Sequence, residues 1–155
     1  MRANLMNQFV LPTTSTLVTP ITSTAQLALT VVKPDAGSHV EDSLDPVGLF
    51  VKWSAVTLAG SNTYRFQVQQ SSDNAGQSAV LTVADTGAMA ITDPRLVNVD
   101  QLFLAIDWSL VTQKYLTVLL TLAGNGTPSI SILMADLRNA SEVSHPTAVA
   151  ANYTP

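Results

Sequence analysis

Residues 64–70 constrain the fold more than any other stretch, because apolar and polar side chains alternate along them. Tyr64, Phe66 and Val68 are apolar, and the residues between them are Arg or Gln. A β-strand has a side-chain period of two, so the apolar set lies on one face and the polar set on the other. The next six residues are nearly all turn formers, and an apolar run resumes at 79–83. The pattern predicts a β-hairpin with one face in a core.

The rest of the chain repeats this signal in short segments. No segment has a capped 3.6-residue period, and turn signals recur roughly every 8–15 residues, as in β-sandwiches. The sequence therefore predicts about seven or eight strands in an all-β, antiparallel β-sandwich. Besides the hairpin, the segments predicted as strands are 26–32, 47–58, 88–92, 102–108, 115–122 and 129–134.

Two of these strands are too apolar to have one face exposed to solvent. Phe50 and Trp53 are an odd number of residues apart, so a regular strand places them on opposite faces. The run 102–106 is almost continuously apolar. Such a strand is either buried on both sides, or has one face in a core and the other in an interface.

The chain carries little charge for its length of 155 residues, which is the size of one domain. Charged residues make up 12% of it, against about 25% in an average soluble domain. Thr, Ser, Asn and Gln take their place, which suits strands and leaves little charge repulsion at the surface. Such a surface favours a protein that works packed against neighbours.

Composition also bears on several classes of function. The net charge is −4 and the basic residues are scattered, so direct nucleic-acid binding has no electrostatic footprint. The chain contains no cysteine, which excludes disulfides and thiolate zinc sites. No stretch reaches the roughly 18 apolar residues of a membrane span, and no signal peptide is visible in the first ten residues. We therefore expect no nucleic-acid or membrane partner.

No pattern of catalytic or metal-binding residues stands out, so we expect no enzyme, no metal and no cofactor. His39 and His145 lie in polar segments without ligand-spaced partners, and no Gly-x-Ser-x-Gly elbow occurs. A small hydrolase therefore lacks a motif. The loop acids Glu41, Asp42 and Asp45 do not match a calcium loop, which favours a solvated loop.

Four aromatic residues could form a stacking platform for a sugar, but they sit inside apolar strands, which favours a core role. These residues are Trp53, Tyr64, Trp108 and Tyr115.

The two ends of the chain differ from its middle. Residues 1–24 are rich in Thr, Ser and Pro, and we interpret them as an extended N-terminal arm; residues 139–155 form a small-residue C-terminal tail. The first segment is either a frayed terminus or an arm that lies on another subunit. The second interpretation has a physical reason, because apolar arm side chains are costly to leave in water. The folded domain then spans residues 25–138.

Two short patterns resemble the jelly-roll capsid cement, or decoration, proteins of tailed bacteriophages. The first is a strand and loop of the form F-x-V-Q-x-S-D-D/N-x-G, which residues 66–76 resemble with one additional serine before the Asp-Asn pair. The second is K/R-Y-L-x-V/L, matched by 114–118 and followed by a Gly-rich turn and a small-residue strand at 130–135. The likeness covers roughly residues 25–138.

The resemblance implies a jelly-roll-like sandwich that acts as a structural protein on the outer surface of a virion. Copies of such proteins associate as dimers or trimers and bridge neighbouring major capsid proteins, against the pressure of packaged DNA. The alternative is a carbohydrate- or host-binding β-sandwich module. The residues expected to contact the capsid or another subunit are Leu5, Met6, Phe9, Val10, Leu11 and Tyr153.

Overall fold

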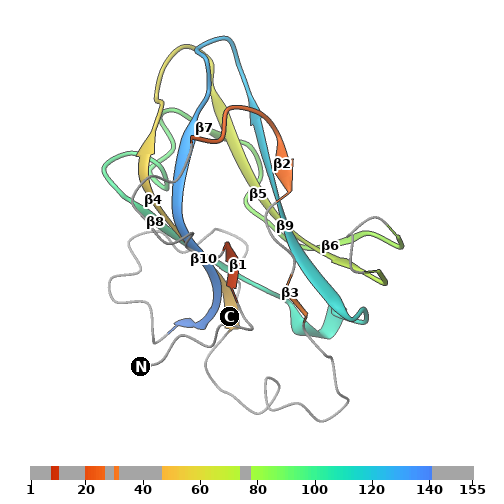
Figure 1. The fold of residues 1–155 in the computed structure, drawn as a ribbon. Coiled ribbons are helices and arrows are strands. Elements are labelled where there is room, and N and C mark those ends of the chain that lie inside the picture. The colour runs from red at the N-terminus through yellow and green to blue at the C-terminus, as the bar shows by residue number, and fades with distance from the viewer. Residues whose placement is uncertain (1–7, 11–19, 27–29, 32–46, 74–77, 141–155) are drawn as a thin grey trace.

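The protein is an all-β, antiparallel β-sandwich of two sheets packed face to face, as the sequence predicts (Figure 1). The computed structural model describes residues 8–10, 20–26, 30–31, 47–73 and 78–140. Within these ranges no helix is long and apolar enough to cross a membrane.

One sheet includes a strand from the predicted N-terminal arm, and we call it the arm-bearing sheet. Its strand order is β1-β10-β4-β8. All of its neighbouring strands are antiparallel. Its strands are β1 (Gln8–Val10), β4 (Val47–Val56), β8 (Gln101–Ala105) and β10 (Ile130–Asn139).

The other sheet, which we call the second sheet, contains the hairpin that the alternating pattern predicts. Its order is β2-β9-β5-β6, with β3 also paired to β9 and β7 to β5. Its strands are β2 (Ala25–Gln26), β3 (Thr30–Val31), β5 (Thr63–Ser71), β6 (Leu81–Asp85), β7 (Met89–Ala90) and β9 (Tyr115–Ala123). The predicted strand 26–32 thus corresponds to two short strands, β2 and β3, on the same partner.

The pairing runs inward from the two ends of the chain. β1 pairs with β10, β2 and β3 with β9, β4 with β8, and β5 with β6. The first half of the chain therefore lies antiparallel against the second half, and this long ribbon is wrapped into two sheets. Most residue contacts join positions far apart in the sequence, so the fold depends on long-range strand pairing and not on local segments.

The core lies between the sheets and takes the apolar face of each strand. The alternation in β5 is confirmed: Tyr64, Phe66 and Val68 are fully buried, whereas Arg65 and Gln67 are on the other face. Leu102 and Leu104 of β8 fill the same core. Its largest buried side chains are Trp53, Tyr64, Phe66, Leu49, Met89, Leu96, Leu102, Leu104, Leu116, Leu120 and Ile130.

Buried polar groups fasten one end of the sandwich. The fully buried Asn62 accepts a hydrogen bond from the Gly126 N–H (2.8 Å) and donates to the carbonyl oxygens of Thr57 (3.2 Å) and Gly126 (3.0 Å). A Cβ at Gly126 would lie 2.1 Å from the Ala59 carbonyl oxygen, so only glycine fits there. These bonds join the turn between β4 and β5 to the turn between β9 and β10.

Two strand boundaries differ from the sequence prediction for local reasons. The strand expected at 79–83 begins at Leu81, because Ala79 has a φ of +52°, which is incompatible with a strand. The strand expected at 102–108 ends at Ala105, because Asp107 caps a short 3₁₀ turn, η2 (Trp108–Leu110), by accepting from the Ser109 N–H.

Candidate functional site

The outer face of the arm-bearing sheet carries a second apolar cluster. Phe50 of β4 is in register with Phe103 of β8 on one side and with Asp136 of β10 on the other. The two rings are only 4% and 3% exposed, although they point away from the main core, and Ala105, Met134 and Ala140 pack against them. The sequence prediction that Phe50 and Trp53 lie on opposite, covered faces is therefore confirmed.

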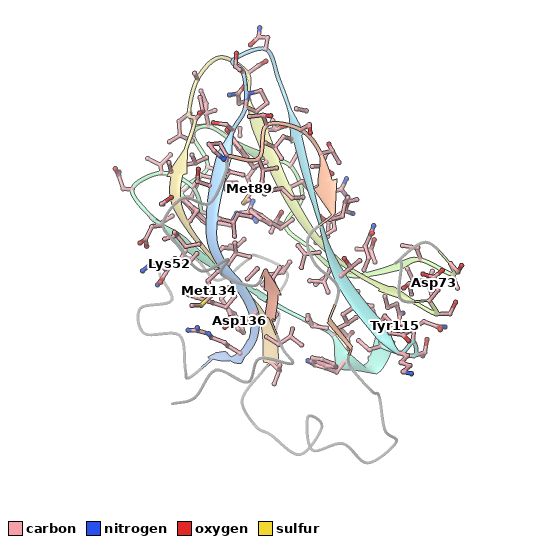
Figure 2. The ribbon with its side chains drawn as sticks, viewed as in Figure 1. Lys52, Asp73, Met89, Tyr115, Met134 and Asp136 are labelled. Carbon is pink, nitrogen blue, oxygen red and sulfur yellow. The ribbon has the colours of Figure 1, made fainter. Side chains whose placement is uncertain are left out.

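An ion pair lies beside these rings. The Arg138 Nε and Nη2 atoms donate to the two Asp136 carboxylate oxygens at 3.0 and 3.1 Å. The guanidinium carbon is 4.4 Å from the centre of the Phe50 ring, and Nη2 is 2.8 Å from the Met134 sulfur. Figure 2 shows Met134 and Asp136 on this side of the sheet. Asp136 is 4% exposed, so its charge depends on Arg138 for compensation.

The predicted arm reaches this same face at its edge. Gln8 of β1 is in register with Asp136, and Val10 with Ala135, so the arm continues the row that runs through Phe50. Further along, Ile21 and Ile130 exchange two backbone hydrogen bonds of 2.9 and 3.1 Å. Part of the predicted arm is therefore an edge strand of the sandwich.

The predicted contact residues divide into two groups. Phe9 and Val10 lie in β1, beside β10. Leu5, Met6, Leu11 and Tyr153 lie outside the described residues. The structure thus brings two of the six predicted contact residues to the arm-bearing sheet.

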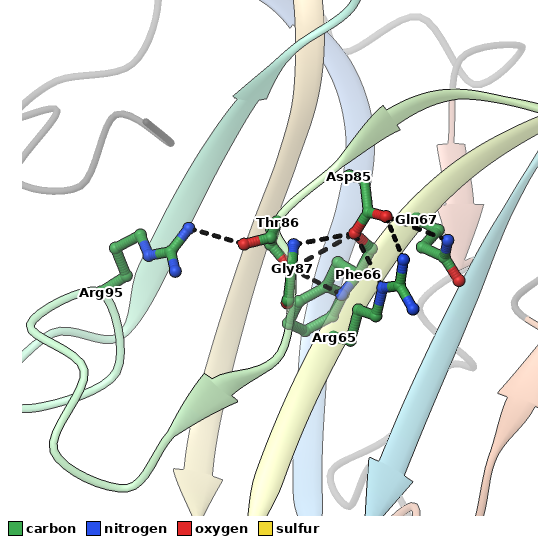
Figure 3. A network of polar contacts seen from close by, with 7 residues as sticks. All are labelled: Arg65, Phe66, Gln67, Asp85, Thr86, Gly87 and Arg95. Atoms are coloured by element: carbon green, nitrogen blue, oxygen red, sulfur yellow. Dashed lines mark hydrogen bonds and ion pairs between the residues drawn. The ribbon is translucent and has the colours of Figure 1, made fainter. Parts of the chain in front are cut away.

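The outer face of the second sheet is polar instead. Its central group is Asp85, whose carboxylate accepts from the Arg65 guanidinium, with the Nε–Oδ1 bond at 2.9 Å (Figure 3). Gln67 Nε2 (3.1 Å) and the Gly87 N–H (2.8 Å) also donate to it. These hydrogen bonds, that of Arg65 above all, lower the pKa of Asp85, and partial burial opposes them.

A second ion pair extends this network toward the following loop. Arg95 donates to both carboxylate oxygens of Asp93, at 2.9 and 2.7 Å, and lowers the pKa of that carboxyl. Its Nη1 donates to the Thr86 carbonyl oxygen at 2.9 Å (Figure 3). The Thr86 hydroxyl in turn accepts from the Phe66 N–H, which ties the loop to β5.

The aromatic residues considered as a sugar platform do not form one. Trp53 and Tyr64 are 2% and 0% exposed in the core, which confirms their predicted core role. Trp108 is half-buried against the core and donates from Nε1 to the Val47 carbonyl oxygen at 3.0 Å. Tyr115 is half-buried, with the Lys114 ammonium 5.3 Å from its ring centre.

The remaining candidates for chemistry fall elsewhere in the chain. His39, His145 and the loop acids Glu41, Asp42 and Asp45 lie outside the described residues. Among the described residues, no group of three or more His, Asp or Glu side chains is placed to hold a metal ion.

Sequence reasoning did not single out Asp136 and Arg138. A signal for them exists, because Met134, Asp136 and Arg138 alternate with Ala135 and Leu137, which face the core. A register shift between Ile132 and Met134 puts this alternation out of phase with the start of the strand, where Ile132 faces the core. The charged residues looked like the end of the strand. They extend it because each neutralises the other.

Comparison with known proteins adds no relative to this picture. Neither protein-family models nor a search of curated proteins finds a match to the chain.

Proposed function

We propose that the chain is a structural virion protein that binds the outside of a phage head. It stabilises the head by bridging neighbouring major capsid proteins, and the arm-bearing sheet faces the capsid. In this proposal the sandwich is a spacer, the terminal segments are clamps, and no catalysis or cofactor is involved.

The strand order supports a jelly-roll assignment of the fold. If β2 and β3 are counted as one interrupted strand, and the two-residue β7 is set aside, eight strands remain in two four-stranded sheets. They pair from the chain ends inward, and successive strands repeatedly change sheets. Jelly rolls have eight strands in two sheets and are found in viral capsid and lectin domains. This agrees with the family that residues 66–76 and 114–118 resemble.

The observation that carries the proposal is the apolar outer face beside the arm. A sandwich that works alone needs one core, and its outer faces can be polar. Here Phe50 and Phe103 form a second buried cluster, and β1 lies at the edge of the same sheet. Both rings are already buried within the single chain, so this side supports the proposal through the arm at its edge and not through an exposed apolar surface.

An arm of this kind can anchor the protein by burial alone. Fully burying one large apolar side chain such as Phe9 contributes about 1.5–3 kcal/mol, so a few such side chains from the arm together account for stable attachment. The low charge of the chain reduces the cost of removing water from the contact.

The alternative function, a carbohydrate- or host-binding module, would need an exposed aromatic platform, which the four aromatic residues considered for it do not form. Trp53 and Tyr64 cannot stack on a sugar from inside the core. No other described feature favours that alternative over the capsid role.

The test is to delete residues 1–20 and measure binding to purified mature heads that lack the protein. The deletion removes β1 and keeps Ile21, which bridges Ile130. We expect binding to fall below detection while the circular dichroism spectrum retains its β signature. Unchanged binding would contradict the arm mechanism.

A milder variant distinguishes an effect on head binding from an effect on the stability of the fold. Phe9→Ser keeps the β1 backbone and removes one large apolar side chain, so we expect weaker binding with little change in melting temperature. Gln69→Ser, on the polar outer face of the second sheet, is the matched control and should bind like the unaltered chain.

A further inference from the structure

The turn between β9 and β10 contains the only Asn–Gly pair of the chain, Asn125-Gly126. An asparagine deamidates most readily before glycine, because glycine has no side chain to hinder attack by its own nitrogen. The Gly126 nitrogen loses its proton to solvent base and attacks Asn125 Cγ. The bond from Cγ to the side-chain nitrogen breaks, ammonia leaves, and the cyclic imide then adds water to give aspartate or isoaspartate. Asn125 is exposed, so only the fold can slow this reaction.

Backbone conformation does not explain why this pair is present. Asn–Gly is favoured in two-residue hairpin loops, where both residues adopt a positive φ. Here the pair links strands of different sheets, and neither Asn125 nor Gly126 has a positive φ. The positive values in this turn belong to Gly124 (+123°) and Thr127 (+53°). The contacts of the two residues therefore have to account for them.

The nucleophile of the reaction is held in a buried hydrogen bond. The Gly126 N–H donates to Asn62 Oδ1 at 2.8 Å, and the Gly126 carbonyl oxygen accepts from Asn62 Nδ2 at 3.0 Å. Asn62 is 0% exposed, and its Nδ2 also donates to the Thr57 carbonyl oxygen at 3.2 Å. Solvent base can therefore remove the Gly126 proton only after a buried bond has opened, which costs free energy.

The electrophile is held by the turn between β4 and β5. Asn125 Oδ1 accepts from the Ser61 N–H (3.0 Å) and from the Ser61 hydroxyl (3.1 Å). Gly60 makes room for this oxygen, because a Cβ at position 60 would lie 2.5 Å from it. Both bonds restrict the rotation by which an asparagine side chain reaches the nitrogen of the next residue.

Close packing also limits the movement of the backbone at this pair. A Cβ on Gly126 would lie 2.1 Å from the Ala59 carbonyl oxygen and 2.9 Å from Asn62 Oδ1. Ring closure rotates the peptide group that joins Asn125 to Gly126, and the neighbouring turn crowds that rotation. Figure 1 shows the two turns at the same end of the sandwich. Packing thus requires glycine at position 126, and the same contacts restrain the labile pair that glycine creates.

We propose that residues 59–62 and 124–127 form a lock that protects Asn125 from deamidation in the folded chain, and that Asn125 is the main deamidation site once the lock opens. Isoaspartate would add a methylene to the backbone and shift Gly126 away from Asn62, so a chain that has reacted cannot restore the lock. This chemistry belongs to the chain alone and does not depend on binding to a head.

Incubation of the full chain at mildly alkaline pH, with and without urea, is the first test. Samples are digested with pepsin in acid, where deamidation is slow, and aspartate and isoaspartate at position 125 are measured by peptide mass spectrometry. We expect conversion at least about tenfold slower in the folded chain than in the unfolded one, because the buried bond has to open first. A synthetic peptide of residues 121–130 in the same two buffers corrects for any effect of urea on the reaction.

Two variants weaken the lock at different points. Asn62→Ala removes the acceptor of the Gly126 N–H and should raise the conversion rate of the folded chain at least about fivefold. Ser61→Ala removes one bond to Asn125 and should raise the rate about twofold to threefold, and it keeps the test valid if Asn62→Ala does not fold. Ser72→Ala removes an exposed hydroxyl bond in another loop and is the matched control, with an unchanged rate. Melting curves verify that each variant is folded.

Amide hydrogen exchange reports on the nucleophile directly. The Gly126 N–H of the folded chain should exchange at least about tenfold more slowly than in the peptide, and faster in Asn62→Ala than in the unaltered chain. Exchange of Gly126 at the peptide rate, or equal conversion of Asn125 in the folded and unfolded chains, would overturn the proposal. A conversion rate that neither Asn62→Ala nor Ser61→Ala changes would overturn it as well.

Discussion

The two outer faces of this sandwich are built from the same strand alternation and have opposite character. On the arm-bearing sheet, the outward positions of β4, β8 and β10 hold Phe50, Phe103 and a buried ion pair. On the second sheet, the outward positions of β5 hold Arg65 and Gln67, which lie half-exposed beside Asp85. The first face is covered around these rings, although the side chain of Lys52 beyond them is 41% exposed, and the second face is a hydrated surface.

The comparison shows that a similar ion pair does different work on the two faces. Asp136 and Arg138 are 4% and 25% exposed, so their charges must compensate each other. Asp85 and Arg65 are 25% and 43% exposed, and water already solvates much of their charge. We infer that the first pair makes an apolar face possible, whereas the second organises a loop.

The largest expected effect comes from removing a ring of the covered face. Phe50→Ala should lower the free energy of unfolding by about 3–5 kcal/mol, as for a core phenylalanine, because Phe50 is nearly as buried as the residues between the sheets. Urea denaturation followed by tryptophan fluorescence gives the value. The matched change on the polar face, Gln67→Ala, should stay within about 0.5 kcal/mol. Equal losses at the two sites would remove the distinction between the faces.

The two carboxylates provide the next comparison. Asp136→Asn leaves the Arg138 guanidinium without its counter-charge in a mostly buried site, and should cost about 2–3 kcal/mol, below the full penalty because Arg138 reaches solvent. Asp85→Asn should lower the free energy of unfolding much less, since both charges of the Asp85–Arg65 ion pair are partly solvated. The same denaturation experiment measures both. A larger loss for Asp85→Asn than for Asp136→Asn would reverse our assignment.

Acid titration should reveal a smaller contribution from the polar face. The pKa values of Asp85 and Asp93 are lowered from the ordinary value of 3.8, so between the lowered and ordinary values the unfolded chain binds more protons than the folded one. The stability that these two ionised carboxylates give the folded chain is complete above the ordinary pKa, and it is lost as the pH falls through the lowered pKa of the folded state. Melting temperatures from pH 6 to pH 2 should show this loss, and Asp93→Asn should reduce it. If the melting temperature of the Asp93→Asn variant fell with pH as steeply as that of the unaltered chain, the stabilising role of Asp93 would be contradicted.

Much of the fold follows from local sequence patterns, because the two-residue period determines which side chain faces inward. The β5 alternation and the opposite faces of Phe50 and Trp53 are both read from spacing. The length of β10 cannot be read from spacing. Asp136 and Arg138 look like the end of a strand in the sequence, and their ion pair is apparent only in the structure. The start of β6 depends on the φ of Ala79, which no propensity indicates.

The candidate site was harder to predict than the fold. Composition predicts an extended arm at 1–24, but the pairing of β1 with β10 joins residues more than a hundred positions apart, and no local signal encodes it. The buried side chain of Gln70 likewise bonds to the carbonyl oxygen of Leu110, which is far away in the sequence. Contacts of this kind are set by the tertiary fold, and a single sequence does not reveal them.

The most direct test of the central claim asks which face meets the capsid. Because the chain has no cysteine, Lys52→Cys on the outer side of the arm-bearing sheet and Gln69→Cys on the outer side of the second sheet can each be labelled with a bulky maleimide polymer. Each labelled protein is then added to heads that lack it, and the bound fraction is measured. Our account predicts that the label at position 52 blocks binding, whereas the label at position 69 leaves it intact. Blocking at position 69 alone, or equal binding of both labelled proteins, would contradict it.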